Sequence, residues 1–151
     1  MVAEKNYLIE TLKSSGIKSQ VYTEMKKLKQ GNEPHVGAVL RNGETLSRSG
    51  SKRKFVDQEG QRKRRVKLWD RSTSLHVVIA DTSEEKVEKI LDSFLRKLKK
   101  GIDVDENWVN IVVGEVDWVE EGDSILKAKV AVQFDITFEG GIYCLLYTSD
   151  A

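Results

Sequence analysis

Basic side chains dominate one segment of the sequence and offer its clearest candidate for chemistry. This segment, which we call the basic arm, carries eight cations opposed only by Asp57 and Glu59: Lys52, Arg53, Lys54, Arg62, Lys63, Arg64, Arg65 and Lys67. Such a cluster can bind phosphate groups, with an affinity that falls steeply as salt rises. Binders of single strands also place aromatic rings against the bases, and only Phe55 and Trp69 are close here. A solvated hairpin and an arm that docks on an acidic neighbour are therefore alternatives to a nucleic-acid site.

An acidic segment at residues 103–107 begins like a calcium-binding loop, because Asp103, Asp105 and Asn107 alternate along it. A calcium loop of this kind needs glycine at its sixth position and glutamate at its twelfth. This chain has Trp108 and Gly114 at those positions. We therefore predict an acidic turn and not a metal site.

The remaining polar residues do not form a catalytic pattern. The two histidines, His35 and His76, have no cysteine or histidine nearby in the sequence, so no metal site is predicted. There is no Gly-rich phosphate loop with its lysine and no G-x-S-x-G motif, and Glu120 and Glu121 have no base beside them. We predict a protein that is not an enzyme and takes no cofactor or metal, with His76 at a surface or a contact.

Charge is unevenly divided along the chain, although the formal net charge is only +1. Residues 1–80 hold 17 basic and 8 acidic side chains, whereas residues 81–151 hold 8 basic and 16 acidic. Such a division suits head-to-tail contacts between copies of one subunit, or a nucleic-acid patch with an acidic shield. Alternatively, the two halves interleave in the fold and their charges largely cancel.

Hydrophobic periodicity predicts the elements that must position these residues. A helix is predicted at residues 4–13 and ends at Gly16, while residues 17–28 fit either a helix or a strand. A short strand follows at residues 36–40, and Asn42-Gly43 is a strong hairpin signal before a returning strand.

The second half of the chain has clearer patterns. A turn is predicted at residues 57–60 and a long strand at residues 66–80. Thr82 and Glu85 predict a capping box that begins an amphipathic helix ending near Gly101. This helix has too much apolar surface to remain in water, so we expect it to lie on the sheet.

Two predicted strands follow this helix, and three tryptophans accompany the sheet. Residues 108–119 form one predicted strand with a bulge at Gly114, and residues 120–123 form the last turn. Residues 126–138 alternate strictly, which predicts a half-buried antiparallel strand whose buried face carries Leu126, Ala128, Val130, Val132, Phe134, Ile136 and Phe138. The three tryptophans, Trp69, Trp108 and Trp118, are expected in the core and on the sheet face.

Together these elements predict an α+β fold, with a mainly antiparallel sheet and an N-terminal and a long central helix packed on one face. Residues 1–143 are long enough for a single domain. Residues 1–12 resemble neither a signal peptide nor a membrane span, so a soluble, intracellular product is expected. Residues 144–151 resemble a translated sequencing adapter and are expected to be a non-native tail, so Cys144 carries no argument.

The second half of the chain resembles a known family. The strand that ends at Leu75–Ala80, the helix at 83–100, the strand at 108–119 and the segment 123–143 resemble tail terminator and tail-completion proteins of long-tailed bacteriophages and prophages. The first half resembles them only in the order of its elements. The motifs are patterns of fold and not catalytic signatures.

The resemblance implies a small α+β subunit that forms a ring, commonly a hexamer, on the last ring of the tail tube. Such a ring stops tube polymerisation and offers a surface for joining to the head. The implied partners are further copies of the chain, the tail-tube protein and a head-completion or connector protein, at the head-proximal end of the virion tail and without a membrane. A head–tail connector or neck subunit, and a nucleic-acid-binding module that uses residues 52–67, are the alternatives.

Overall fold

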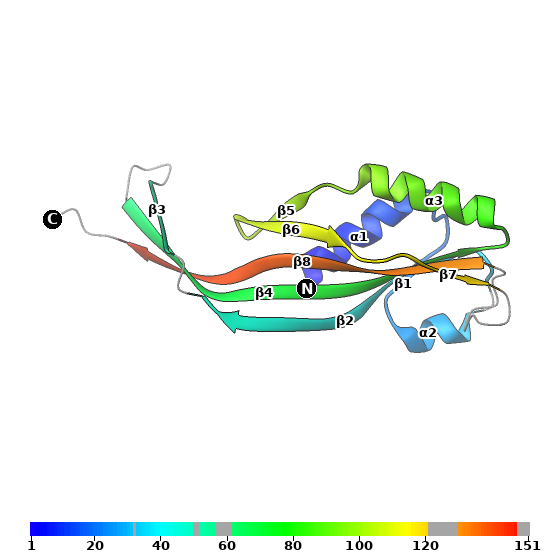
Figure 1. Cartoon of the computed structure of the whole chain (residues 1–151), viewed down its shortest axis with the longest axis horizontal. Coiled ribbons are helices and arrows are strands. Elements are labelled where there is room, and N and C mark those ends of the chain that lie inside the picture. The colour runs from blue at the N-terminus through cyan, green and yellow to red at the C-terminus, as the bar shows by residue number, and fades with distance from the viewer. Residues whose placement is uncertain (32, 50–51, 57–61, 121–129, 148–151) are drawn as a thin grey trace.

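A long twisted sheet with helices packed against it forms the body of the protein (Figure 1). The structure is a computed structural model. It describes residues 1–31, 33–49, 52–56, 62–120 and 130–147, with the backbone alone for residues 52–56, 62–65, 120 and 145–147. The predicted α+β class is confirmed.

The described elements follow one another in a mixed order. The helices are α1 (Val2–Ser14), α2 (Met25–Gln30) and α3 (Glu84–Lys97). The strands are β1 (Val21–Tyr22), β2 (Val36–Arg48), β3 (Lys52–Val56), β4 (Arg62–Asp81), β5 (Gly101–Val104), β6 (Asn107–Val113), β7 (Asp117–Glu120) and β8 (Val130–Tyr147). The described part of the chain contains no helix with the length and apolar character needed to cross a membrane.

The sheet is organised around its two longest strands. Its order is β1-β2-β4-β8-β6-β5, while β3 pairs with the beginning of β4 and β7 pairs with the beginning of β8. β1 and β2 are parallel, and the other described pairs are antiparallel. β4 and β8 pair from Lys63↔Tyr147 to Asp81↔Val130, so they form a continuous axis that connects the body to the basic arm.

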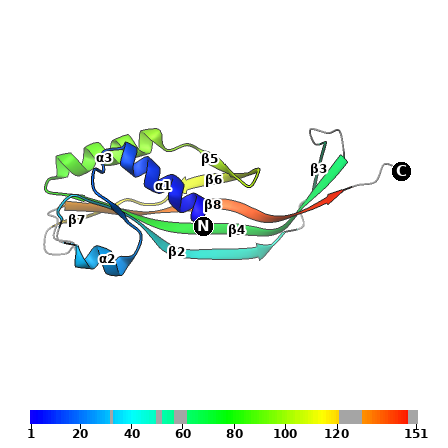
Figure 2. The same cartoon turned by 180° about the vertical axis from the view of Figure 1, so that it is seen from behind.

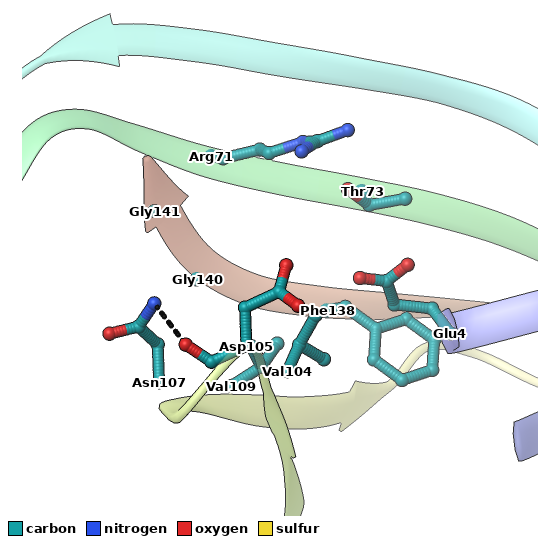
Figure 3. A pocket seen from close by; sticks show the side chains of 10 residues that line it. All are labelled: Glu4, Arg71, Thr73, Val104, Asp105, Asn107, Val109, Phe138, Gly140 and Gly141. Carbon is teal, nitrogen blue, oxygen red and sulfur yellow. Dashed lines mark hydrogen bonds between the residues drawn. The ribbon is translucent and has the colours of Figure 1, made fainter. Parts of the chain in front are cut away.

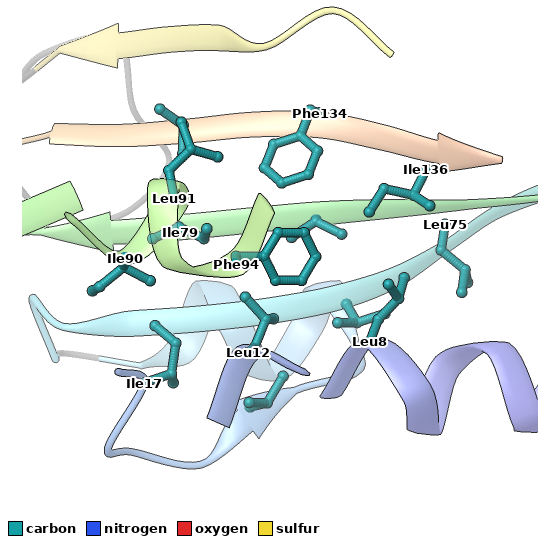
Figure 4. Close-up of a cluster of buried hydrophobic side chains, with 14 of the residues drawn as sticks. Leu8, Leu12, Ile17, Leu75, Ile79, Ile90, Leu91, Phe94, Phe134 and Ile136 are labelled. Atoms are coloured by element: carbon teal, nitrogen blue, oxygen red, sulfur yellow. The ribbon is translucent and has the colours of Figure 1, made fainter. Parts of the chain in front are cut away.

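The main core lies between one face of this sheet, which we call the inner face, and helices α1 and α3 (Figure 4). Alternate residues of β8 enter it, as predicted: Val130, Val132, Phe134, Ile136 and Phe138. Leu126 and Ala128 lie outside the described residues. The helices contribute Leu8, Leu12, Val87, Ile90, Leu91 and Phe94, all buried. Each such side chain contributes about 1.5–3 kcal/mol by leaving water, so this face supplies most of the stability.

A smaller core lies on the opposite face of the sheet, the outer face. There Leu28 of α2 packs on a patch of small and branched side chains: Val36, Ala38, Leu40, Val78, Ala80 and Ala131. α1 and α2 lie on opposite sides of the sheet in both views (Figures 1 and 2). The ambiguous segment at residues 17–28 therefore holds both predicted types of element, since β1 is followed directly by α2.

The predicted hairpin at Asn42-Gly43 is wrong. β2 runs without reversal from Val36 to Arg48 and pairs with β4 along its whole length, with a register shift between Arg41 and Gly43. A two-residue hairpin of the predicted type requires positive φ at its turn residues. Among the described glycines only Gly16 has a positive φ, of 118°, so Gly43 forms part of a bulge and not of a turn.

The strand predicted at residues 108–119 is divided into two, β6 and β7, and the irregularity lies at the predicted position, Gly114. β6 ends at Val113 and β7 begins at Asp117. Between them the N–H of Gly114 donates a hydrogen bond to the carbonyl of Asp135, at 2.8 Å. Both strands pair with the same edge of β8, so the chain leaves that edge and returns to it.

The predicted capping box is wrong by one residue. The N-cap of α3 is Ser83, whose Oγ accepts a hydrogen bond of 3.3 Å from the N–H of Lys86. The N–H of Thr82 donates instead to Asp81 Oδ1, at 2.7 Å. Because the third helical residue is therefore a lysine, no glutamate is placed to complete a capping box.

Candidate functional site

The basic arm is an extension of the sheet beyond its helices. β3 pairs antiparallel with the first residues of β4, and in both views this pair projects past the end of the body (Figures 1 and 2). The register places Arg53 opposite Arg65 and Lys54 opposite Arg64. Like charges directly opposite each other destabilise a pair of strands, so this arrangement favours binding of an anionic or acidic partner.

Lys67 is the one cation of the basic arm whose side chain the structure describes. Its Nζ lies 2.7 Å from Asp70 Oδ1 and 5.9 Å from the centre of the Tyr143 ring. It is therefore paired within the chain at the root of the arm. The other side chains of the arm (residues 52–54 and 62–65) lie outside the described residues, as does the predicted turn at residues 57–60.

An aromatic and a cationic side chain stack where the arm joins the body. The guanidinium carbon of Arg48 lies 4.7 Å from the centre of the Trp69 ring, and the two residues are cross-strand partners. Such a contact is worth about 0.5–1 kcal/mol at an exposed site. The guanidinium covers one face of the Trp69 ring, so that face is not open to stack on a nucleotide base.

His76 lies on the outer face, half-buried, at the surface position that the sequence predicted. Its Nδ1 is 2.7 Å from Asp135 Oδ1, and its Nε2 is 3.1 Å from Gln133 Oε1. Both ring nitrogens are therefore engaged by neighbours on β8. The arrangement ties β4 to β8 across the sheet and leaves neither nitrogen available to a substrate.

His35 is also held at both ring nitrogens. Its Nδ1 lies 2.8 Å from Asp81 Oδ2, and its Nε2 accepts a 3.0 Å hydrogen bond from the N–H of Lys18. Burial raises the pKa of the Asp81 carboxyl, but hydrogen bonds from His35 and from the N–H of Thr82 outweigh burial, so the pKa lies below its ordinary value. The cluster joins the segment after α1 to the ends of β2 and β4, and we interpret it as structural.

A small pocket of about 80 Å³ opens on the inner face, beyond the helices (Figure 3). Arg71 and Thr73 of β4 line one side, and Asp105 and Asn107 of the β5–β6 turn line the other. Asp105 has a φ of 51°, as a tight two-residue hairpin requires. The acidic turn predicted at residues 103–107 is present but shorter, at Asp105 and Glu106, and it forms one wall of this pocket.

Arg71, Glu44 and Glu4, at or beside this pocket, are already paired. The guanidinium of Arg71 donates to Glu44 Oε1 at 2.9 and 2.5 Å, and Thr73 donates to the same oxygen at 3.1 Å. These bonds, from Arg71 above all, outweigh burial and hold the pKa of the Glu44 carboxyl below its ordinary value. The buried Glu4 carboxylate lies 2.7 Å from the N-terminal ammonium group. The pocket thus presents no uncompensated acid or base among these groups.

Metal binding finds no support in the described residues, where no group of three or more histidine, cysteine, aspartate or glutamate side chains is placed to hold an ion. Neither the two His–Asp pairs nor the stacking of Arg48 on Trp69 was predicted from the sequence. The His76–Asp135 pair could have been predicted if the register of β4 with β8 had been known, because this register places the two residues directly opposite each other.

Comparison of the sequence with models of protein families, and with curated proteins, found no match.

Proposed function

We propose that this chain is a structural protein of a long-tailed phage or prophage virion. It forms a ring on the last ring of the tail tube, ends polymerisation of the tube and presents the surface that joins the head. The observation that carries the proposal is the basic arm, an extension that leaves the body, in which the start of β4 lies between β3 and the end of β8 and the register of β3 with β4 brings like charges together. Such an arm is suited to bind another protein subunit and contributes little to its own stability.

The organisation of the body supports the same proposal. An N-terminal helix and a long central helix contribute to one core with an antiparallel sheet whose last strand is long and alternating. This is the arrangement expected from the resemblance to tail terminator proteins. By the same resemblance the ring is a hexamer, and its partners are the tail-tube protein and a head-completion or connector protein.

The polar groups of the described residues favour a structural role over catalysis. The two histidines bond at both ring nitrogens, and Arg71 is bound by Glu44. A catalytic group needs a lone pair or proton that can reach a substrate. In these clusters the groups are used to connect strands.

Polymerisation of the tail-tube protein from the same phage tests the proposal. With the wild-type chain present we expect short, capped tubes in electron micrographs, and without it longer tubes of variable length. Replacing Arg62, Lys63, Arg64 and Arg65 by serine should abolish docking to the tube while leaving the fold intact. Capping that is unchanged in this variant would contradict the role of the arm, and tubes unaffected by the wild-type chain would contradict the proposed function.

Two alternatives retain support. A head–tail connector or neck subunit would show the same ring but bind the head side, so binding to the connector and not to the tube would favour it. A nucleic-acid-binding module would use the two basic runs that β3 and β4 bring together. That alternative predicts binding to duplex or single-stranded DNA whose affinity falls steeply with salt.

A further inference from the structure

The outer face of the sheet is exposed beyond the area that α2 covers. Thr137 of β8 points to this side, because Ile136 and Phe138 on either side of it enter the inner core. Its cross-strand partner Val112 of β6 therefore points there too, as does Trp108, four residues earlier on the same strand and opposite Asp103. Trp108 is 54% exposed and Val112 is 45% exposed. These two large apolar side chains are exposed on the same sheet face, with Asn110 between them.

Acidic side chains surround these two apolar residues. Carboxylates from β5, β7 and β8 lie on the outer face by the register of the strands: the exposed Asp103, Asp117 and Glu139, and the half-buried Asp135. Among them Asp135 is paired with His76, as described above. Exposed lysines of α2 limit the acidic area at the end where that helix packs. The outer face beside β5–β8 thus carries two exposed apolar side chains and an excess of acidic ones.

This surface complements the basic arm of the same molecule. Residues 52–67 carry eight cations and two acids, so the arm has an excess of positive charge where the outer face has an excess of negative charge. The arm continues the same sheet, because β4 pairs with β8 from the body into the arm. It therefore cannot lie on its own outer face without breaking that pairing.

We propose that the outer face binds the basic arm of a second copy of this chain. The inference rests on the ring-forming part of the proposed function and names the two surfaces that meet. The arm and the outer face are different parts of the molecule, so the contact is head-to-tail and closes into a ring when its rotation allows. Exposed ion pairs between opposite charges are screened by salt, so association weakens as salt rises.

Charge reversal on the outer face tests this contact directly. The first variant combines Asp103→Lys, Asp117→Lys and Glu139→Lys. Its matched control combines Glu10→Lys, Glu88→Lys and Asp92→Lys, which makes the same charge change at exposed positions of α1 and α3. Sedimentation velocity and native mass spectrometry of the full chain, at several protein and salt concentrations, measure self-association. We expect it to weaken about tenfold or more in the first variant, equivalent to about 1.4 kcal/mol, and to change little in the control.

A second variant reverses the arm and allows a rescue. Arg53→Glu, Lys54→Glu, Arg64→Glu and Arg65→Glu make the arm acidic while keeping like charges opposite each other in the register of β3 and β4. Alone, this variant should associate as poorly as the first variant. Mixed in equal amounts, the two variants should associate again, because each arm then meets a face of opposite charge. Thermal unfolding of each variant confirms that it is folded.

Several outcomes would overturn the inference. The outer-face variant could associate as well as the wild type, the mixture could fail to recover, or the wild type could remain a monomer at low salt and high concentration. A fourth such outcome is an arm variant that loses only DNA binding, which would support the nucleic-acid alternative. The tube-length measurement above decides the proposed function separately, since a ring that forms only on the tube would still cap it.

Discussion

The two ends of strand β4 show how one strand can serve stability at one end and recognition at the other. At its C-terminal end Leu75, Val77 and Ile79 are buried against α1 and α3, and their alternation gives the strand one dry face. At its N-terminal end Arg62–Arg65 is a run of charge without alternation, so it offers no apolar face for a core. The difference teaches that burial holds the body together, and that the basic arm can change with little cost to the fold.

The core of the body should give the largest effect. Phe94 of α3 is fully buried, and its ring centre lies 5.8 Å from that of Phe134. We expect Phe94→Ala to lower the free energy of unfolding by about 3–5 kcal/mol, because it removes transfer energy and leaves a cavity. Urea denaturation measures this. Leu95→Ala, at a neighbouring exposed position, is the control and should cost far less.

Close packing at the edge of the sheet should give the next effect. A methyl group on Gly101 would overlap the carbonyl oxygen of Val109 and lie 2.5 Å from the Trp108 ring. We expect Gly101→Ala to destabilise the fold by up to about 3 kcal/mol, since the backbone must move. Gly43 has open space around it, so Gly43→Ala is the matched control. Equal melting temperatures for the two variants would contradict this account of the β5–β6 edge.

Acid should weaken the body through Asp81 and Glu44, whose pKa values are lowered in the folded chain. Such carboxyls contribute stability that is complete above their unfolded pKa and is lost as pH falls through the folded pKa. The free energy of unfolding should therefore hold down to about pH 5 and fall below it. Asp81→Asn should cost about 1–2 kcal/mol at pH 7 and flatten that fall. Asp92→Asn is the exposed control, and parallel pH curves for Asp81→Asn and wild type would refute this role.

The start of α3 should give a smaller effect. Ser83 caps the helix through its bond to the N–H of Lys86. Ser83→Ala should therefore lower the free energy of unfolding by about 1 kcal/mol. Thr82→Ala, one residue earlier, should cost less. A larger loss of stability from Thr82→Ala than from Ser83→Ala would contradict Ser83 as the cap and support the capping box predicted from the sequence.

Substitution in the basic arm should change stability least. We expect the serine variant of Arg62–Arg65 to unfold within about 0.5 kcal/mol of the wild type, because it removes surface charge away from the helix-covered core. Chemical denaturation measures this on the protein used in the tube-length assay. A large loss of stability would instead mean that the arm supports the body, and the contrast between the two ends of β4 would fail.

Local patterns in the sequence were sufficient for the broad fold. The alternation that ends at Phe138 predicted the buried face of β8. Helical spacing predicted most of the buried side chains of α3, but of the six residues at that spacing, Val87, Ile90, Leu91, Phe94, Leu95 and Leu98, Leu95 is exposed and Leu98 is only partly buried. Turn signals were less reliable. The Asn42-Gly43 signal competed with the continuous pairing of β2 with β4, and the pairing prevailed. A local turn preference is worth less than a row of cross-strand bonds and buried contacts.

The sequence by itself determined the α+β class, the buried faces and the charge of the basic arm, because hydrophobic period and composition are properties of neighbouring residues. Only the tertiary structure decided how distant residues meet. His35 bonds Asp81 across 46 positions, and His76 bonds Asp135 across 59. It also placed α2 on the outer face and set which residues of the two basic runs lie opposite each other. Those contacts depend on strand register, which is set by the packing of the whole sheet.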